Sequence, residues 1–392
     1  MLWGILIILS VYFIYFVIVN ADKQSHGFAT YYTASRLLDE REDVSRFYDD
    51  DWFSSNVKRF SPEVYEIYHV NLPTTSLIML PLVKFDYSNA RIIWTIFNLI
   101  MLFTVVLFLL QKFNYKDIWV PLIIILFLSF QPLYANFLFG QAYIIVFCLL
   151  VVAWYAYVSG NEKLLGVAIG LIFVFKSAGF LFWLFLILQQ RWKSLVWGLL
   201  TVSVVILFSL PWIGIDAWQT YIEKITSLVS NPSSSVTAYQ TLHSFFHHLT
   251  IFNKVWNPEP LVNLPLLGNL LSIFSVLTIT GVSSFIALKN KKSEIVFGAF
   301  IIAGVLISPA SLDYHYTILL LPFLLLINNI RKDSSAILWV MLLITIFLIA
   351  AYLPYASPRF AKGFWAIFAY PKLYGAIGLW GLFIRAAYRS EV

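Results

Sequence analysis

An acid and an imidazole, Asp313 and His315, lie between two apolar stretches in the segment SPASLDYHYTILLLP, residues 308–322. Ionisable side chains are costly near hydrocarbon, so each one placed there is a functional hypothesis. Acids and imidazoles are also the usual groups for proton transfer. The alternatives are structural: Asp313 could cap the helix that follows it, and His315 could be a packed histidine.

Three further polar residues stand at or inside apolar stretches, Asn136 and Gln141 in ANFLFGQAY and Lys176 in FVFKSAG. On the topology described below, all three fall at the outer ends of their membrane segments, as do Asp313 and His315. The sequence therefore predicts that they line one shared outer cavity. Asn136 and Gln141 could instead bond a neighbouring helix or cap a terminus, and Lys176 could extend to the surface.

Two other groups of polar residues resemble metal sites. His243, His247 and His248 come with no acid at ligand spacing, so a surface amphipathic helix is the better interpretation. The adjacent acids of FYDDDWF cannot all face one ion, and they favour a solvated face. The sequence holds no Walker loop, dinucleotide fingerprint or HExxH pair. We therefore predict neither a metal ion nor a cofactor.

The composition is that of a membrane protein. The 392 residues are 60% hydrophobic with a mean hydropathy of +0.81, and the 12% of charged residues cluster between apolar runs long enough to cross a bilayer. The net charge of +6 does not imply nucleic acid, because in such proteins the distribution of charge matters more than its sum. One cysteine, Cys148, lies inside an apolar run and cannot form an internal disulfide.

These runs predict an all-α polytopic membrane protein with about twelve transmembrane segments. The two segments on either side of Lys176 are short, which indicates a helical hairpin broken at KSAG. The first segment lacks a basic region ahead of it and a cleavage motif, so we interpret it as a retained anchor. The predicted spans are residues 2–20, 89–111, 118–134, 141–158, 164–175, 177–189, 194–212, 263–288, 295–309, 314–329, 335–353 and 373–388.

The charges on alternate connections predict the orientation. One set of connections, including the C-terminal tail from residue 385, carries 12 Lys and Arg against 5 Asp and Glu, whereas the other set carries 12 against 15. Short basic connections such as KNKK and RKD remain in the cytoplasm. Both termini are therefore predicted to be cytoplasmic, with the long loops on the outer face.

The long outer loops belong to one integral membrane domain, residues 1–392. The first, residues 21–88, carries aromatic and apolar residues at helical spacing, which predicts interfacial amphipathic helices. Its segment LPTTSLIMLPLV, residues 72–83, is too short to span and predicts a re-entrant or interfacial helix. The second loop, residues 213–262, adds another predicted surface helix in DAWQTYIEKITSLVS.

Several motifs occur in a characteristic order along most of the chain. They are HGFATYYTASRLL followed by RFYDDDWF, then NLPTTSLIMLPL, ANFLFGQAYIIVFCLLVVAW, GLIFVFKSAGFLFWLFLILQQRWK and SPASLDYHYTILLLP. In this order the chain resembles glycosyltransferase family 87, the polyprenyl-phosphate-mannose-dependent alpha-mannosyltransferases. The resemblance implies a C-type glycosyltransferase fold and a lipid-phosphate sugar donor, with chemistry on the non-cytoplasmic face.

The resemblance also implies roles for residues. Lys176, Asn136 and Gln141 suit the donor phosphate and sugar, and Tyr31 and Tyr32 of the YY-x-A-S element are predicted to bind substrate. These roles follow from the family motifs and not from the spacing alone.

An inverting transfer also needs a base, and the motifs leave several acids open for that role. The family pattern places an acid directly before the aromatic residue of the first outer loop, where this chain has Gly27 before Phe28. The base role then falls to Asp313 or to a first-loop acid such as Asp22 or Asp49. His315 would contact the donor phosphate or orient the acid.

Two other functions would also use buried polar residues. A transporter or flippase of a lipid-linked substrate would show paired repeats with breaks near the midplane, whereas this sequence shows one break and outward polar groups. A catalytically inactive family member that binds a lipid glycan would explain Gly27. The transferase interpretation predicts a polyprenyl-phosphate sugar, a glycan or glycolipid acceptor and membrane lipid as partners, in the plasma membrane.

Overall fold

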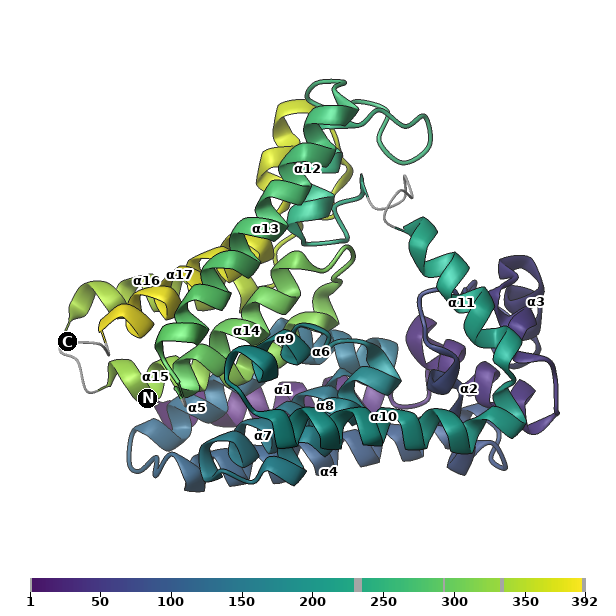
Figure 1. The fold of residues 1–392 in the computed structure, drawn as a ribbon, viewed down its shortest axis with the longest axis horizontal. Coiled ribbons are helices and arrows are strands. Elements are labelled where there is room, and N and C mark those ends of the chain that lie inside the picture. The colour runs from purple at the N-terminus through teal and green to yellow at the C-terminus, as the bar shows by residue number, and fades with distance from the viewer. Residues whose placement is uncertain (1, 229–234, 292, 332–334, 390–392) are drawn as a thin grey trace.

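The computed structural model describes residues 2–228, 235–291, 293–331 and 335–389, and this part of the chain is helical, with one isolated antiparallel bridge. Two groups of helices meet at an angle, so that the molecule is wedge-shaped (Figure 1). The α-helices are α1 (Leu2–Asn20), α2 (His26–Asp39), α3 (Asp50–Phe60), α4 (Tyr87–Lys112), α5 (Trp119–Leu128), α6 (Gln131–Phe139), α7 (Tyr143–Ser159), α8 (Glu162–Lys176), α9 (Leu181–Leu188), α10 (Trp192–Ile213), α11 (Ile215–Leu228), α12 (Leu242–Thr250), α13 (Pro265–Lys289), α14 (Glu294–Ile307), α15 (Leu320–Ile330), α16 (Ala336–Ala350) and α17 (Pro371–Arg389).

The first group contains α1 and α4 to α8 with α10, and its closest packing is between α8 and α10. The second group contains α12 to α14, α16 and α17. Helix α14 lies against α9, α7 and α15, so it joins the two groups (Figure 1).

Four described helices, α1, α4, α10 and α13, are long and apolar enough to cross a membrane, or six spans if each of two bent pairs counts as one. One bent pair is α5 with α6, which the sequence analysis treated as the single span 118–134; the structure bends it by 46° and extends it to Phe139. The described residues thus support a membrane protein with several spans. The count of twelve stays a prediction, because helices such as α14 and α16 are shorter than a full crossing.

Apolar side chains on the outside of the long helices support the same conclusion. On α1, large apolar residues including Ile7, Ile8 and Tyr15 are exposed, and Phe13 and Val17 are the buried apolar residues. A helix that is hydrophobic all round and yet exposed needs a lipid environment.

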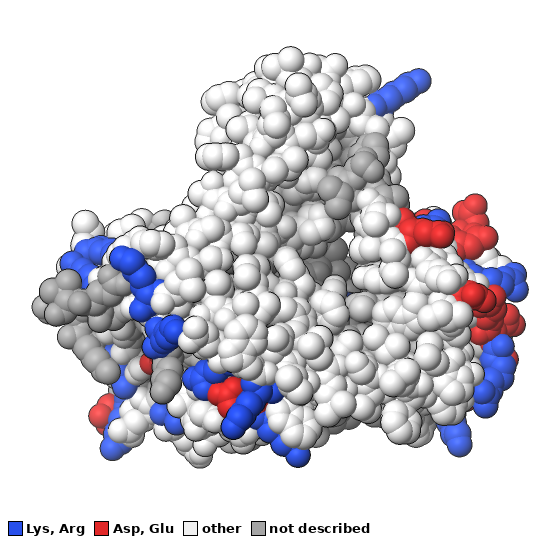
Figure 2. Space-filling model, viewed as in Figure 1, with Lys and Arg blue, Asp and Glu red and all other residues white. Residues whose placement is uncertain are grey.

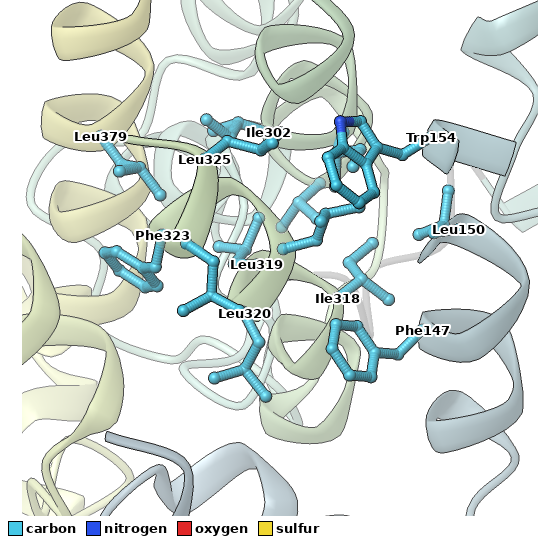
Figure 3. Close-up of a cluster of buried hydrophobic side chains, with 14 of the residues drawn as sticks. Phe147, Leu150, Trp154, Ile302, Ile318, Leu319, Leu320, Phe323, Leu325 and Leu379 are labelled. Atoms are coloured by element: carbon cyan, nitrogen blue, oxygen red, sulfur yellow. The ribbon is translucent and has the colours of Figure 1, made fainter. Parts of the chain in front are cut away.

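The core is centred on α15, whose apolar residues are all buried. Leu319 to Leu326 are almost fully enclosed, which a uniformly apolar helix requires. Figure 3 shows Phe323 and Leu325 of α15 among side chains from α7, α14 and α17, among them Phe147, Ile302 and Leu379. This core fixes the segment just before α15, where Asp313 and His315 lie.

The first outer loop folds as a compact cap. It contains α2, α3 and three 3-10 helices: η1 (Val44–Tyr48), η2 (Pro73–Leu77) and η3 (Leu80–Leu82). The segment predicted as a re-entrant or interfacial helix is therefore two short 3-10 helices. Pro73 begins η2 and Pro81 lies inside η3, and proline is best tolerated at such first-turn positions.

The second outer loop contributes α11 and α12, while its residues 229–234 lie outside the described part. The surface helix predicted in DAWQTYIEKITSLVS corresponds to α11. The prediction that His243, His247 and His248 lie on a surface face is wrong, because α12 packs on α13 and all three are buried. Nδ1 of His243 lies 3.0 Å from Oγ of Ser272 in α13.

The chain ends N and C lie at the same end of the molecule (Figure 1). Lys and Arg dominate the visible charge at that end, whereas most of the visible acids gather at the opposite end, over α2 and α3 (Figure 2). This distribution agrees with the predicted orientation, in which basic connections lie in the cytoplasm.

Candidate active site

Lys176 is the last residue of α8, and its backbone is held from a distant part of the chain. Ser177 follows with a left-handed φ of 50°, which ends the helix. The hydroxyls of Thr74 and Thr75 in η2 donate hydrogen bonds to the carbonyl oxygens of the two residues before Lys176, the second at 2.9 Å. The last carbonyls of a helix have no partners within it. The Thr74 and Thr75 hydroxyls therefore satisfy two of these carbonyls. They also fix the backbone from which the Lys176 side chain extends.

The ammonium group of Lys176 is surrounded by polar and aromatic groups. Its Nζ lies 3.2 Å from Oδ1 of Asn71, 4.7 Å from the ring centroid of Tyr31 and 5.8 Å from that of Tyr143. The ring of His315 lies 4.3 Å from that of Tyr143, and His315 interacts electrostatically with Lys176. The side chains of Tyr31 and Asn71 come from the first outer loop, so this loop closes over the end of α8.

Tyr31 is fixed in turn by Gln141. The Tyr31 hydroxyl donates a hydrogen bond to Oε1 of Gln141, with 2.5 Å between the oxygens. A Cβ atom added at Gly27 would lie 2.0 Å from Nε2 of Gln141 and 2.9 Å from the carbonyl oxygen of Phe139. The Gln141 amide therefore occupies the space that a side chain at position 27 would need.

Glu66 belongs to this site, although the sequence analysis did not select it. Its Oε1 lies 3.0 Å from Nδ1 of His26, and its Oε2 accepts a 2.8 Å hydrogen bond from the Thr30 hydroxyl. Its side chain is 22% exposed, and it interacts electrostatically with Lys176 and Tyr31. The hydrogen bond to Glu66 raises the pKa of His26 above its ordinary value. We call this group the polar site; it consists of Tyr31, Glu66, Asn71, Tyr143, Lys176 and His315.

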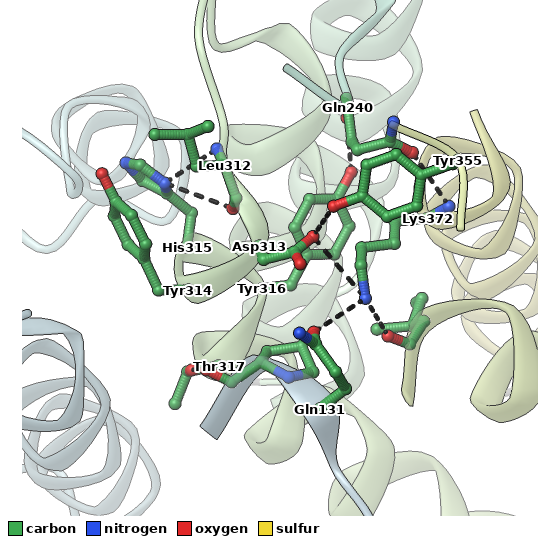
Figure 4. Close-up of polar contacts among 12 residues, drawn as sticks. Gln131, Gln240, Leu312, Asp313, Tyr314, His315, Tyr316, Thr317, Tyr355 and Lys372 are labelled. Carbon is green, nitrogen blue, oxygen red and sulfur yellow. Dashed lines mark hydrogen bonds and ion pairs between the residues drawn. The ribbon is translucent and has the colours of Figure 1, made fainter. Parts of the chain in front are cut away.

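Asp313 lies apart from the polar site. Asp313 and His315 are two residues apart in the 3-10 helix η5 (Asp313–Leu319), which has about three residues per turn, so their side chains point to different sides. Figure 4 shows His315 beside Tyr314 on one side of η5 and Asp313 beside Lys372 and Tyr355 on the other. His315 therefore belongs to the polar site, whereas the Asp313 side chain lies on the other side of η5 (Figure 4).

Asp313 is engaged in a cluster of its own. Its Oδ1 lies 3.7 Å from Nζ of Lys372 and accepts a hydrogen bond from the Tyr355 hydroxyl. Burial raises the pKa of Tyr355, so its hydroxyl keeps the proton that it donates. Lys372 is 1% exposed and also donates to the carbonyl oxygen of Ile349 at 2.7 Å and to Oε1 of Gln131 at 3.3 Å. This pattern is that of a structural ion pair.

Two of the predicted binding residues bond to protein groups outside the polar site. Asn136 in α6 donates to the carbonyl oxygen of Tyr314 at 3.1 Å and to Oγ1 of Thr317 at 2.5 Å, so it ties α6 to η5. The Tyr32 hydroxyl donates to the carbonyl oxygen of Phe85 at 2.6 Å. Tyr31 and Tyr32 are neighbours on α2, and consecutive helical residues point in different directions.

The predicted first-loop acids are exposed, and their recorded interactions lie outside the polar site. Oδ1 of Asp49 accepts a 3.1 Å hydrogen bond from the backbone N–H of Trp52 and so caps α3. Asp22 interacts electrostatically with Arg91 in α4. Among the described residues, no group of three His, Cys, Asp or Glu is arranged to hold a metal ion.

An apolar groove of about 600 Å³ lies close to the polar site. It runs between the C-terminal half of α10, with Val204, Phe208 and Trp212, and the residues Leu77 and Leu80 of η2 and η3. Asp39, the last residue of α2, and Arg41, two residues later, line the groove as well. The same η2 segment therefore forms a wall of the groove and fastens the residues before Lys176.

The profile of glycosyltransferase family 87 matches residues 70–309, which is more than half of the chain. The chain belongs to this family. The matched range of this family 87 glycosyltransferase includes Gln141 and Lys176, but it begins after Tyr31 and ends before Asp313. No curated protein and no solved structure matches the chain.

Proposed function

We propose that this family 87 protein transfers a hexose, mannose by family analogy, from a polyprenyl-phosphate donor to a lipid-linked or surface glycan. The single observation that carries the proposal is the position of Lys176, a partly exposed cation held at the end of α8 by Asn71 and two tyrosine rings. In a transfer from a lipid phosphate, negative charge develops on the leaving phosphate, and a fixed cation at that point lowers the barrier.

The surroundings of Lys176 suit a sugar phosphate. The ring of His315 packs on Tyr143 and is available to contact the phosphate. Tyr31 and Gln141 present hydroxyl and amide groups to the sugar from the opposite wall. Aromatic rings with one polar end are common where a ligand has an apolar and a polar part.

The groove beside η2 suits a lipid tail. Its lining is apolar, and it lies along α10, one of the helices long enough to cross a membrane. A polyprenyl chain that leaves the membrane there would bring its phosphate towards the η2 end of the groove, where Thr75 fastens the last turn of α8. Asp39 and Arg41 would then lie at the depth of lipid headgroups.

The proposed location follows from charge. The excess of Lys and Arg in the short connections supports cytoplasmic termini and a polar site on the outer face of the plasma membrane. Family membership favours a transferase over a transporter or flippase, and Lys176 with its partners favours an active enzyme over an inactive lipid-glycan-binding protein.

The test is to incubate the purified full chain with a radiolabelled polyprenyl-phosphate hexose and a membrane extract as the source of acceptor. A new labelled lipid or glycan is the expected result. Label that crosses a vesicle membrane without a new product would instead indicate transport. Donor binding without either outcome would indicate an inactive binding protein.

A further inference from the structure

Position 27 lacks the side chain that could act as a base, but the structure places a carboxylate beside the same helix. Thr30 lies on the same face of α2 as His26 and Gly27, because positions three and four apart are neighbours around a helix. His26 and Thr30 on this face both bond the carboxyl group of Glu66. The loop that follows α3 therefore supplies a carboxylate to the face where Gly27 supplies none.

The loop that carries Glu66 also contacts Lys176. Five residues further along the same loop, Asn71 bonds Nζ of Lys176 at 3.2 Å. Glu66 interacts electrostatically with Lys176, Tyr31 and Tyr314, whose side chains come from three separate parts of the chain. The Glu66 carboxylate and the Lys176 ammonium group come from different elements and interact electrostatically, as a proton acceptor and a leaving-group stabiliser of one site would.

The carboxylate is also positioned and accessible. Each of its oxygens has one partner from α2, His26 Nδ1 at 3.0 Å and the Thr30 hydroxyl at 2.8 Å. A carboxylate oxygen has two acceptor positions, so each keeps one for a substrate hydroxyl. The side chain is 22% exposed, and that of His26 is 60% exposed. Asp313, in contrast, is bonded to Lys372 and Tyr355.

We propose that Glu66 is the general base of this enzyme and that His26 is a positioning residue for it; this inference rests on the proposed transferase function. The acceptor hydroxyl gives its proton to a carboxylate oxygen of Glu66 while its oxygen forms the new bond to the anomeric carbon. The bond between that carbon and the phosphate oxygen breaks, and its electron pair stays on the polyprenyl phosphate beside Lys176. The products are polyprenyl phosphate and the extended acceptor.

The variant E66Q tests the proposal in the purified full chain. Removing a general base costs about 100-fold to 10,000-fold in rate, so turnover should fall by at least the lower figure. Gln keeps oxygen and size at this position, so binding of the polyprenyl-phosphate hexose should remain that of the wild type, and so should the melting temperature above the pKa of His26, where the ion pair with Glu66 no longer contributes. The matched control is E63Q, an exposed acid three residues earlier in the same loop, which should keep full turnover.

Wild-type turnover in E66Q would overturn the proposal, and so would a loss of donor binding that accounts for the loss of rate. If E66Q does not fold, the variant E66D tests the proposal instead. It keeps the carboxylate but shortens the side chain by one methylene. It should bind donor normally and turn over more slowly, and full turnover would contradict the proposal. Absence of product from the wild-type enzyme would instead refute the transferase function itself, so the two failures are distinguishable.

Discussion

Asp313 and Lys372 form an ion pair, with 3.7 Å between Oδ1 and Nζ, at the start of η5. The lysine is 1% exposed and the aspartate 20%. Replacing Asp313 with Asn leaves a buried ammonium without its counter-charge, and a buried polar group that loses a partner costs about 1–3 kcal/mol. We therefore expect Asp313→Asn to lower the melting temperature in detergent.

The second variant for this pair is Lys372→Met in the Asp313→Asn background. It removes the uncompensated ammonium, so it should recover part of the lost melting temperature, as pairs of residues in contact are not additive. A melting temperature of Asp313→Asn equal to that of the wild type would contradict the structural role of the pair.

The sequence was informative about helices and about the break beside Lys176. Helices α1, α4, α10 and α13 lie within about two residues of the predicted spans, because long apolar runs have one stable solution in lipid. The break at KSAG is present, with Ser177 in the left-handed region. The length of an apolar run and the position of a helix break depend on neighbouring residues in the chain. The sequence alone can therefore predict both.

The residues of the polar site are brought together by contacts between distant parts of the chain. No local sequence pattern predicts these contacts. Asp313 and His315 were assigned to one cavity by their proximity in the chain, yet a 3-10 turn sends their side chains to different sides. Glu66 lies in an irregular loop, and its partners His26 and Thr30 are about forty residues earlier. Its one signal in the sequence is its place in the acidic first outer loop.

The variant Gly27→Ala tests whether the side-chain amide of Gln141 is fixed beside α2. A Cβ at position 27 would meet Gln141 at 2.0 Å and the backbone oxygen of Phe139 at 2.9 Å, so Gln141 must leave Tyr31. Overpacking of this kind costs about 1–3 kcal/mol. Gly27→Ala should therefore lower both the melting temperature and the rate of sugar transfer.

The control for Gly27 is Gly281→Ala in α13, where a Cβ would meet nothing within 4 Å. Alanine is the better helix former by up to about 1 kcal/mol, so this variant should be at least as stable as the wild type. Equal melting temperatures for Gly27→Ala and the wild type would show that Gln141 moves without cost.

The pair of His26 and Glu66 predicts a pH dependence of stability. The pKa of His26 is raised above 6.5 by its hydrogen bond to Glu66, so the folded protein binds the proton more tightly than the unfolded chain does. The stabilisation is fully present below the unfolded pKa and is lost as the pH rises through the folded pKa. Because His26 is largely exposed, we expect less than about 1 kcal/mol.

The measurement is the difference in melting temperature between the wild type and His26→Gln as a function of pH. The difference should be largest below pH 6.5 and shrink on the alkaline side. In an E66Q background its dependence on pH should be much weaker, because the hydrogen bond to Glu66 is the largest cause of the raised pKa of His26. If the difference in melting temperature instead grew with rising pH, the result would contradict the pairing of His26 with Glu66.

Lys176 should be required for the donor phosphate. Lys176→Met keeps most of the side-chain volume and removes the cation beside Asn71, and loss of one electrostatic stabiliser of a transition state costs about 100-fold or more in rate. Binding of polyprenyl phosphate should weaken as well. Lys163→Met, at the opposite end of α8, removes a cation that packs on Trp197 and should leave both measurements unchanged.

Thr75 should affect catalysis without contacting substrate. Its hydroxyl donates a 2.9 Å hydrogen bond to the carbonyl oxygen of Phe175, directly before Lys176. Thr75→Val keeps the shape but leaves that carbonyl without this partner, at a cost of about 1–3 kcal/mol, and it loosens the last turn of α8. We expect a higher KM for the donor, because the position of the Lys176 ammonium becomes less fixed. Thr278→Val, whose exposed hydroxyl bonds its own helix, should leave KM unchanged, and equal KM values for the two variants would exclude this positioning role.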